Sequence, residues 1–287
     1  MKFVQFRYNH DPDEIHVGYM ENEDVVDINK YSPGMPRTMC GILKTGCTCN
    51  AVKIKHLDPL VEPKASVTLV APITGMDKIL GVDRNYVDFC DEQKVQIPSQ
   101  PLIYTKFPSN IIGPNESVKI KTDVVKEVDW EVHLAVIIGQ TCSSVSAADA
   151  FKYVFGYTVA QSICSRDWEK QNPGELLFGK AQDTFCPLGP WIVTCDEIED
   201  PHNIQISCSV NGVEKQNSHT SRVIHKVPDI IQRLSSIITL LPGDVILTGT
   251  PAGVGVNRNP QEFLKPGDVV RSEIERIGSF NVMVARF

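Results

Sequence analysis

Glu131 and His133 lie two residues apart in the longest strand-like segment of the chain, Val128–Ile138. Side chains two apart on a strand point to the same face. The spacing therefore predicts a carboxylate and an imidazole on one surface, with the apolar Trp130 and Val132 on the other. Such a pair can hold a metal ion or poise a proton transfer, and a polar, solvated sheet face explains the same spacing.

Four further side chains that could take part in binding or catalysis lie in other segments of the chain. The acidic stretch 85–93, which includes Glu92, predicts either a carboxylate base over a site or a solvated helix face. Arg166 precedes an Asp, which is typical of an ion pair, but a guanidinium also binds a carboxylate through two hydrogen bonds. Lys180 follows a Gly and either reaches an oxygen or lies at the surface. Thr250 lies in a glycine-rich loop whose amides could bind an oxyanion.

Composition is typical of a globular protein. The 287 residues are 42% hydrophobic and carry a formal charge of -7. No apolar run approaches the roughly 20 residues of a membrane span. A net negative charge does not favour binding to the phosphate backbone of nucleic acid, because few counterions would be released. For these two reasons we expect neither a membrane nor a nucleic acid as a partner. The nine scattered cysteines indicate reduced thiols. The start of the chain shows no leader pattern, so we expect a cytoplasmic protein.

The elements that must position these groups are mostly strands. Residues 1–65 predict a small N-terminal α+β module, and Pro and Ser residues then mark a linker. Residues 66–287 predict a larger β-rich body, in which Asn211-Gly212 is a strong hairpin signal. The expected helices lie at 39–44, 51–57, 85–93, 146–154 and 228–238.

Five sequence strings together resemble the fumarylacetoacetate hydrolase family, and the similarity runs along essentially the whole chain. The strings are Asn85-Tyr-Val-Asp, Val128-Asp-Trp-Glu, Ser165-Arg-Asp-Trp, Asp183-Thr-Phe-Cys-Pro-Leu-Gly-Pro190 and Gly243-Asp-Val-Ile-Leu-Thr-Gly-Thr-Pro251. The resemblance implies a β-rich α+β fold of the mixed β-roll or sandwich type with a small N-terminal domain. It also implies a homodimer.

The family's chemistry is Mg²⁺- or Ca²⁺-dependent cleavage of a carbon–carbon bond in β-diketo or oxo acids, and some members decarboxylate or isomerise. Three carboxylates hold the cation, which polarises the keto oxygen. In this sequence the first ligand position is Glu131, but the other two are His133 and Ser162. Asp83 stands where the family has a Gly ahead of its Asn-Tyr pair.

The remaining family positions are partly kept. The lid's His–Glu pair, which activates water in the family, reads Phe89 and Glu92 here. Arg166, Lys180 and Thr250 match their motif positions. The resemblance therefore implies catalytic roles for Glu92 and Lys180, and substrate binding by Arg166, Lys180 and Thr250.

The substitutions predict a degraded metal site, because a hard dication prefers several anionic oxygens and an imidazole and a hydroxyl replace two of them. We therefore expect a non-catalytic or repurposed homologue, a pseudoenzyme that binds a small oxo-acid-like ligand and holds no cofactor tightly. One alternative is a metal-dependent C–C bond hydrolase or decarboxylase with altered ligands. In it Glu131 and His133 take Zn²⁺ or Mn²⁺, with Cys164 or a lid carboxylate completing the shell. A structural, storage-like protein is the other alternative.

Overall fold

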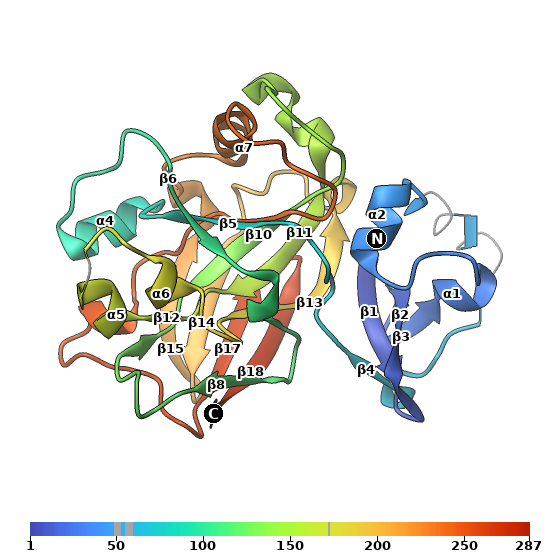
Figure 1. Ribbon diagram of the computed structural model, residues 1–287, viewed down its shortest axis with the longest axis horizontal. Helices are drawn as coiled ribbons and strands as arrows, with labels where there is room; N and C mark the ends of the chain where they lie inside the picture. The colour runs from blue at the N-terminus through green and yellow to red at the C-terminus, as the bar shows by residue number, and fades with distance from the viewer. Residues whose placement is uncertain (49–52, 55–59, 172) are drawn as a thin grey trace.

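The computed structural model describes residues 1–48, 53–54, 60–171 and 173–287 (Figure 1). Within these residues the chain forms mixed β-sheets edged by short helices. The β-rich α+β class expected from the sequence is confirmed.

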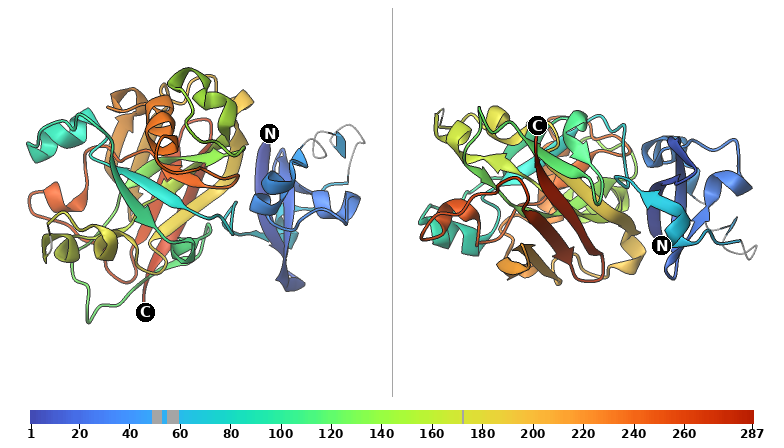
Figure 2. Two further views of the ribbon diagram at one scale, coloured as in Figure 1. Left: turned by 45° about the horizontal axis from the view of Figure 1, so that its top comes forward. Right: turned by 90° about the horizontal axis from the view of Figure 1, so that it is seen from below.

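An N-terminal lobe lies at one end of the molecule, beside a larger body (Figures 1 and 2). Its elements are β1 (Lys2–Tyr8), β2 (Asp11–Glu21), β3 (Asp24–Asp27), α1 (Ile28–Tyr31), α2 (Met39–Thr45) and the 3-10 turn η1 (Lys64–Ser66). The predicted helix at 39–44 is confirmed as α2. The predicted helix at 51–57 falls mostly outside the described residues.

The body holds most of the strands. Its strands are β5 (Ile79–Asp83), β6 (Leu102–Lys106), β7 (Ile111–Ile112), β8 (Ser117–Ile120), β9 (Val128–Asp129), β10 (Val132–Ile138), β11 (Val154–Gln161), β12 (Cys164–Ser165), β13 (Cys186–Thr194), β14 (Gln205–Val210), β15 (Val213–His219), β16 (Val245–Leu247), β17 (Val269–Ile274) and β18 (Gly278–Arg286). Its helices are α4 (Val87–Gln93), α5 (Arg166–Gln171), α6 (Leu177–Lys180) and α7 (Val227–Ser235), with 3-10 turns η2 (Pro108–Asn110), η3 (Ala147–Tyr153), η4 (Cys195–Glu197), η5 (Thr220–Arg222) and η6 (Gly255–Asn257). The strand β4 (Val67–Leu69) pairs with β1 and lies with the N-terminal lobe.

Two large sheets organise these strands among the described residues. The first has the order β3-β2-β1-β13-β11-β10-β16-β5-β6, with β4 added to β1 and β7 to β13. The second has the order β15-β14-β17-β18-β8. Because β1 pairs with β13, the first sheet runs through both predicted domains. The division between residues 65 and 66 falls in η1 and stays a prediction.

The main hydrophobic core lies where side chains of β10 and β11 pack against β14, β17 and β18. Every residue of β10 is buried, since its other face is covered as well. Val136 points into the main core, whereas Ala135 and Ile137 belong to a second apolar cluster that includes α2. A strand covered on both faces reads as a continuous apolar run. His133 shares the face of Ala135, so the solvated-face interpretation of His133 is wrong: the residue is 1% exposed.

Local signals predict several other elements correctly. Asn211 and Gly212 both have positive φ, 53° and 77°, and join β14 to β15 as expected. The helix predicted at 228–238 is α7, which begins and ends slightly earlier. The helix predicted at 146–154 is instead the 3-10 segment η3.

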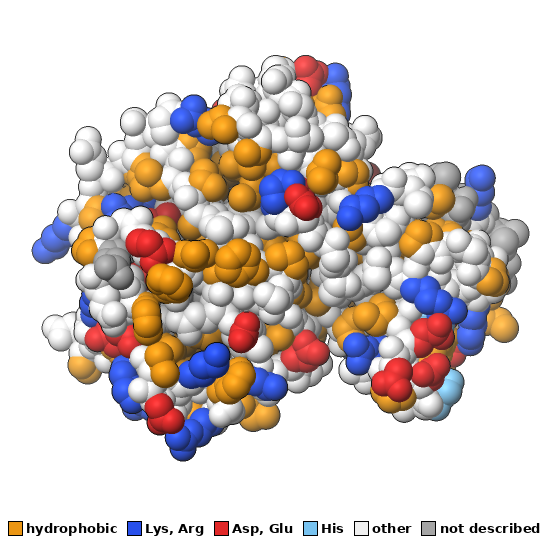
Figure 3. Space-filling view, viewed as in Figure 1, with side chains coloured by type: hydrophobic (Ala, Val, Ile, Leu, Met, Phe, Trp, Pro, Cys, Tyr) orange, Lys and Arg blue, Asp and Glu red, His pale blue; other side chains and the backbone are white. Residues whose placement is uncertain are grey.

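Surface side chains are of mixed type on the face seen in Figure 3, with apolar groups across the middle and both signs of charge along the lower rim. In the described part of the chain, no helix combines the length and apolarity needed to cross a bilayer.

Candidate active site

Glu131 lies in the short link between β9 and β10 and is 2% exposed. The ammonium of Lys180, at the end of α6, donates to both carboxylate oxygens of Glu131 at 2.7 Å. Arg166 Nη2 lies 2.8 Å from Oε1 of the same carboxylate. Burial alone would raise the pKa of Glu131, but the charges of Lys180 and Arg166 outweigh it and hold that pKa well below its ordinary value.

Arg166 begins α5 and contacts three carboxylates. Its Nε donates to Asp129 Oδ2 at 2.9 Å and its Nη1 donates to Glu169 Oε2 at 2.9 Å, in addition to the contact with Glu131. Lys180 lies 3.5 Å from Glu169 as well. We refer to Asp129, Glu131, Arg166, Glu169 and Lys180 as the buried charge cluster. Each of its two cations forms ion pairs with at least two of its three anions, which is the condition under which buried charges are tolerated, although Arg166 Nη2 and Glu169 Oε1 make no hydrogen bond of good geometry.

His133 is held by two partners. Its Nδ1 lies 3.0 Å from the amide nitrogen of Gly249, which is a donor only, so this ring nitrogen accepts. The remaining proton is therefore on Nε2, which lies 3.3 Å from Glu131 Oε2. Burial lowers the pKa of His133, and Glu131 opposes that shift only in part. The imidazole is neutral and has both nitrogens engaged.

The other predicted polar groups also have partners. The hydroxyls of Ser162 and Tyr104 lie 3.0 Å apart. Thr250 Oγ1 accepts a hydrogen bond from Gln216 Nε2 at 2.9 Å. The loop amide of Gly249, which the sequence suggested for an oxyanion, is used by His133.

These contacts test whether the family's dication fits this chain. The ammonium of Lys180 already spans both oxygens of Glu131, which is the place a bound cation would need. His133 has both ring nitrogens engaged, Ser162 offers a neutral hydroxyl that is hydrogen-bonded to Tyr104, and burial raises the pKa of the Cys164 thiol well above its ordinary value. Among the described residues no group of three or more His, Cys, Asp and Glu is arranged to hold a metal. The residues at this position therefore do not fit Mg²⁺, Ca²⁺, Zn²⁺ or Mn²⁺.

A cavity of about 620 Å³ opens beside the buried charge cluster and shares Arg166 and Glu169 with it. Three basic and three acidic side chains line it, together with apolar and small residues. The lining consists of Asp83, Arg84, Phe89, Glu92, Gln93, Arg166, Glu169, Lys170, Pro173, Gly174, Leu176, Val256 and Asn257. A cavity of this size and mixed polarity suits a small charged ligand.

Helix α4 forms one wall of the cavity. Glu92 accepts hydrogen bonds from the Gly253 amide at 3.1 Å and from Asn257 Nδ2 at 2.9 Å, which ties α4 to the loop before η6. Phe89, at the family's lid His position, is 3% exposed and packs with Tyr86 and Val254. The structure thus brings Phe89, Glu92 and Arg166 to one cavity, whereas Lys180 and Thr250 lie outside its lining.

Asp83 and Arg84 are cavity residues to which the sequence analysis gave no role. They end β5 and begin the turn into α4, and Arg84 has a φ of 51°, which is uncommon for a residue with a side chain. An Asp at a position where the family has Gly was the available signal, because a carboxylate at the end of an apolar strand is unusual.

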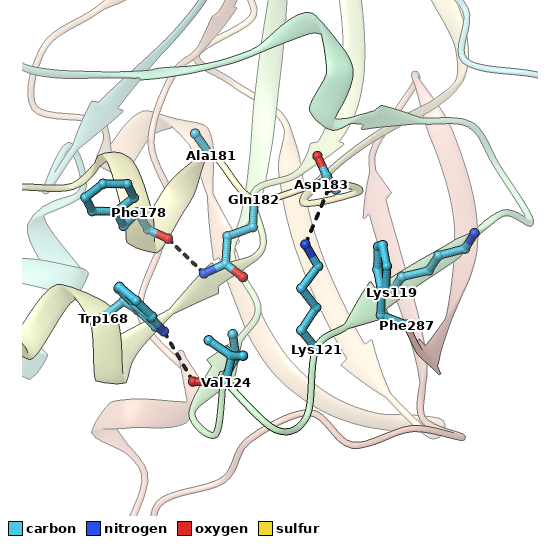
Figure 4. A pocket seen from close by; sticks show the side chains of 10 residues that line it. Lys119, Lys121, Val124, Trp168, Phe178, Ala181, Gln182, Asp183 and Phe287 are labelled. Carbon is cyan, nitrogen blue, oxygen red and sulfur yellow. Dashed lines mark hydrogen bonds and ion pairs between the residues drawn. The ribbon is translucent and has the colours of Figure 1, made fainter.

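A second, smaller pocket of about 290 Å³ is lined by other residues of α5 and α6 and by the segment from β8 onward (Figure 4). Trp168, Phe178 and Val124 supply its apolar surface, and Lys121 lies 3.9 Å from Asp183. None of the site residues predicted from the sequence lines it. The larger cavity is therefore the candidate active site.

The chain belongs to the fumarylacetoacetate hydrolase family. The model of the fumarylacetoacetate (FAA) hydrolase C-terminal domain matches residues 78–285. Among curated proteins, the chain is 46% identical over 283 residues to a Rattus norvegicus protein named oxaloacetate tautomerase Fahd2a, mitochondrial, and 44% identical to the Homo sapiens oxaloacetate tautomerase FAHD2A, mitochondrial. Each match covers 97% of this chain and 90% of the relative.

Solved structures of similar proteins support the same family assignment. Fumarylacetoacetate hydrolase from Exiguobacterium antarcticum is 31% identical with a TM-score of 0.89, covering all of both chains. Maleylpyruvate hydrolase from Sphingobium, in complex with manganese(II) and pyruvate, is 29% identical with a TM-score of 0.82, covering 100% of this chain and 99% of that one.

Two expectations are corrected by these comparisons. The expected pseudoenzyme is contradicted, because relatives similar over nearly the whole chain are named as oxaloacetate tautomerases. These names fit the enzyme alternative that the sequence left open, a hydrolase or decarboxylase of the family, better than the non-catalytic interpretation. The pseudoenzyme prediction was wrong because substitution of two of the family's metal ligands and of its lid His was taken to remove or weaken the inherited reaction. The expected cytoplasmic location is contradicted as well, since these relatives are named as mitochondrial proteins.

Proposed function

We propose that this chain is an enzyme that interconverts the keto and enol forms of a small 2-oxo dicarboxylate such as oxaloacetate. The observation that carries the proposal is 44–46% identity, over 97% of the chain, to proteins named oxaloacetate tautomerases. The cavity supports it, because acidic and basic side chains together line a space of suitable size.

Arg84 is the group best placed to bind a carboxylate of the substrate. Its side chain is 45% exposed, and its ion pair with Asp83 is long, at 3.4 Å from Nε to Oδ2. Arg166, in contrast, already contacts three carboxylates. A guanidinium with open donors binds a carboxylate in a bidentate manner, so Arg84 rather than Arg166 is the proposed direct contact.

The predicted site residues become positioning residues in this proposal. Lys180 and Arg166 hold Glu131 in place behind the cavity wall and Glu169 in the wall itself. Glu92 fixes α4 to the opposite loop through Gly253. Thr250 ties that loop to β15 by accepting a hydrogen bond from Gln216. The homodimer and the absence of nucleic-acid and membrane partners remain predictions.

Tautomerisation suits this cavity better than hydrolysis of a carbon–carbon bond. Hydrolysis needs an activated water, but the lid position that carries His in the family is Phe89 and the carboxylate of Glu92 is already hydrogen-bonded. A keto–enol exchange needs one proton moved at the carbon beside the carbonyl, and stabilisation of the oxygen that gains charge. The proposed keto–enol exchange needs no metal ion, and the donor groups at the family's metal position do not fit one.

The test is the rate at which the purified chain converts enol oxaloacetate to the keto form, followed by the enol's ultraviolet absorbance against a buffer blank. We expect acceleration well above the blank. Parallel measurement of pyruvate separates tautomerisation from decarboxylation: pyruvate formed at the same rate would replace this proposal with decarboxylase activity, and an unaccelerated reaction would refute it.

A further inference from the structure

We propose that Asp83 is the proton carrier of this site: its carboxyl group gives a proton to, and takes one from, the carbon beside the keto group of the bound 2-oxo acid. The inference rests on the proposed function and names the residue that would carry it out.

Comparison of the cavity's three carboxylates points to Asp83. Glu169 is paired with Arg166 at 2.9 Å and lies 3.5 Å from Lys180. Glu92 accepts hydrogen bonds from the loop that faces it. Asp83 has, within the described residues, only the long contact of 3.4 Å with Arg84. It is therefore the cavity carboxylate that remains free to meet a ligand.

The backbone holds Asp83 firmly. Asp83 is the last residue of β5, which pairs with both β16 and β6. Two residues on, the fully buried Asn85 donates from Nδ2 to the Thr248 carbonyl at 2.6 Å and to the His225 carbonyl at 2.9 Å. The intervening Arg84 adopts its positive φ between these anchors. A group held this way meets the reacting atom without further ordering.

The surroundings of Asp83 favour a carboxyl that can hold a proton. Burial raises its pKa, the positive charges of Lys180 and Arg84 oppose that shift, and the negative charges of Glu131 and Glu169 add to it. The side chain is nevertheless 20% exposed, so proton exchange with solvent stays open. An arriving dianion would raise the pKa further, which moves it toward the range in which general acids and bases work.

The step balances without another reactant. In the enol-to-keto direction the O–H bond of the Asp83 carboxyl breaks and a C–H bond forms at the carbon beside the carbonyl. The carbon–carbon double bond becomes single, the carbon–oxygen bond becomes double, and the enol's hydroxyl proton leaves to water. Water returns one proton to the Asp83 carboxylate, which is 20% exposed, so the carboxyl group is regenerated and no net proton is gained or lost. The reverse direction uses the Asp83 carboxylate as the base.

Asp83→Asn tests the inference, because the amide keeps the shape and cannot carry the proton. We expect kcat for enol oxaloacetate to fall by about 10²- to 10⁴-fold, with KM changed less than about threefold. Asp83→Glu should recover part of kcat. The matched control is Asp91→Asn, an exposed residue of α4 outside the cavity lining, which should behave as wild type.

A second measurement does not depend on turnover. Binding of oxalate, followed by calorimetry in buffers of different ionisation enthalpy, should be accompanied by proton uptake in wild type and in Asp91→Asn but not in Asp83→Asn. Active wild type with an equally active Asp83→Asn, or uptake that persists in Asp83→Asn, overturns the role of Asp83. Wild type that does not accelerate tautomerisation overturns the proposed function itself, and the oxalate experiment then decides whether Asp83 is the proton-binding group of the cavity.

Discussion

The buried charge cluster and the cavity beside it use the same residue types in opposite ways. In the cluster, Lys180 and Arg166 lie within 2.8 Å of Glu131 oxygens, and every charge has close partners. In the cavity, Asp83 and Arg84 share one contact of 3.4 Å and are open to solvent. Saturated ion pairs hold a structure in place, whereas loosely paired groups are free to bind or exchange protons. We therefore propose that the family's metal position is structural in this chain and that the groups which bind substrate and carry the proton lie next to it.

Breaking the cluster should produce the largest effect. Glu131→Gln leaves two buried cations without their shared anion, and removal of one partner of a buried pair typically costs about 3–5 kcal/mol. We expect a loss of that size in the free energy of unfolding at pH 7, measured by urea denaturation. Glu199→Gln, at an exposed position, is the matched control and should change stability by less than about 0.5 kcal/mol. Equal stability of the two variants would show that the cluster is not structural.

Glu131→Gln should also change how the free energy of unfolding depends on pH. The pKa of Glu131 is lowered in the folded state, so its contribution is present above the unfolded value of about 4.3 and is lost as pH falls toward the folded value. The free energy of unfolding of wild type should therefore decline below about pH 5 more steeply than that of Glu131→Gln. Parallel curves would contradict the assignment of this charge.

Removal of the Arg84 side chain from the cavity should weaken substrate binding and leave the fold intact. Arg84→Ala should raise KM for oxaloacetate by about 10- to 100-fold, the equivalent of a charge-assisted hydrogen-bond contact of roughly 1.5–3 kcal/mol. The unfolding temperature should change little, because in the part of the chain that the structure describes the Arg84 side chain has only its 3.4 Å contact with Asp83. Arg222→Ala, exposed on η5 and outside the cavity lining, should keep the wild-type KM. An unchanged KM in Arg84→Ala would move substrate binding to another group.

The smallest expected effect is that of added metal. A ligand present at 100 times its dissociation constant stabilises a protein by about 2.7 kcal/mol, which is several degrees in unfolding temperature for a chain of this length. Because Lys180 spans the Glu131 carboxylate, millimolar Mg²⁺ or Mn²⁺ should shift the unfolding temperature by less than about 1 °C. A shift of several degrees that chelator reverses would show that the site still binds a cation.

The sequence predicts local features of this molecule and misses their long-range partners. The two-residue spacing of Glu131 and His133 places both near one face, as strand geometry requires. It does not show that α6 and α5 bring Lys180 and Arg166 onto that carboxylate. The neighbouring Asp167 suggested an ion pair with Arg166. The carboxylate partners of Arg166 are instead Asp129, Glu131 and Glu169, which only the fold brings together.

A local turn and a buried lysine show the same contrast between short-range and long-range contacts. Asn211-Gly212 predicts its hairpin because the turn depends on those two residues alone. Lys106, to which the sequence analysis gave no role, lies at the end of β6, and its buried ammonium donates to three carbonyls, those of Ile163, Lys180 and Phe185. Burial lowers the pKa of Lys106 to about 8. Such a role depends on distant chain segments and leaves no local pattern in the sequence.

The most direct test of the central claim is the conversion of enol to keto oxaloacetate by wild-type protein in the presence of excess chelator. The claim is that this chain catalyses the proton transfer with its own side chains, without a resident divalent cation. It predicts that the chain accelerates the conversion above the buffer rate to the same extent with and without EDTA. No acceleration in either condition, or acceleration that EDTA abolishes and Mg²⁺ or Mn²⁺ restores, would contradict it.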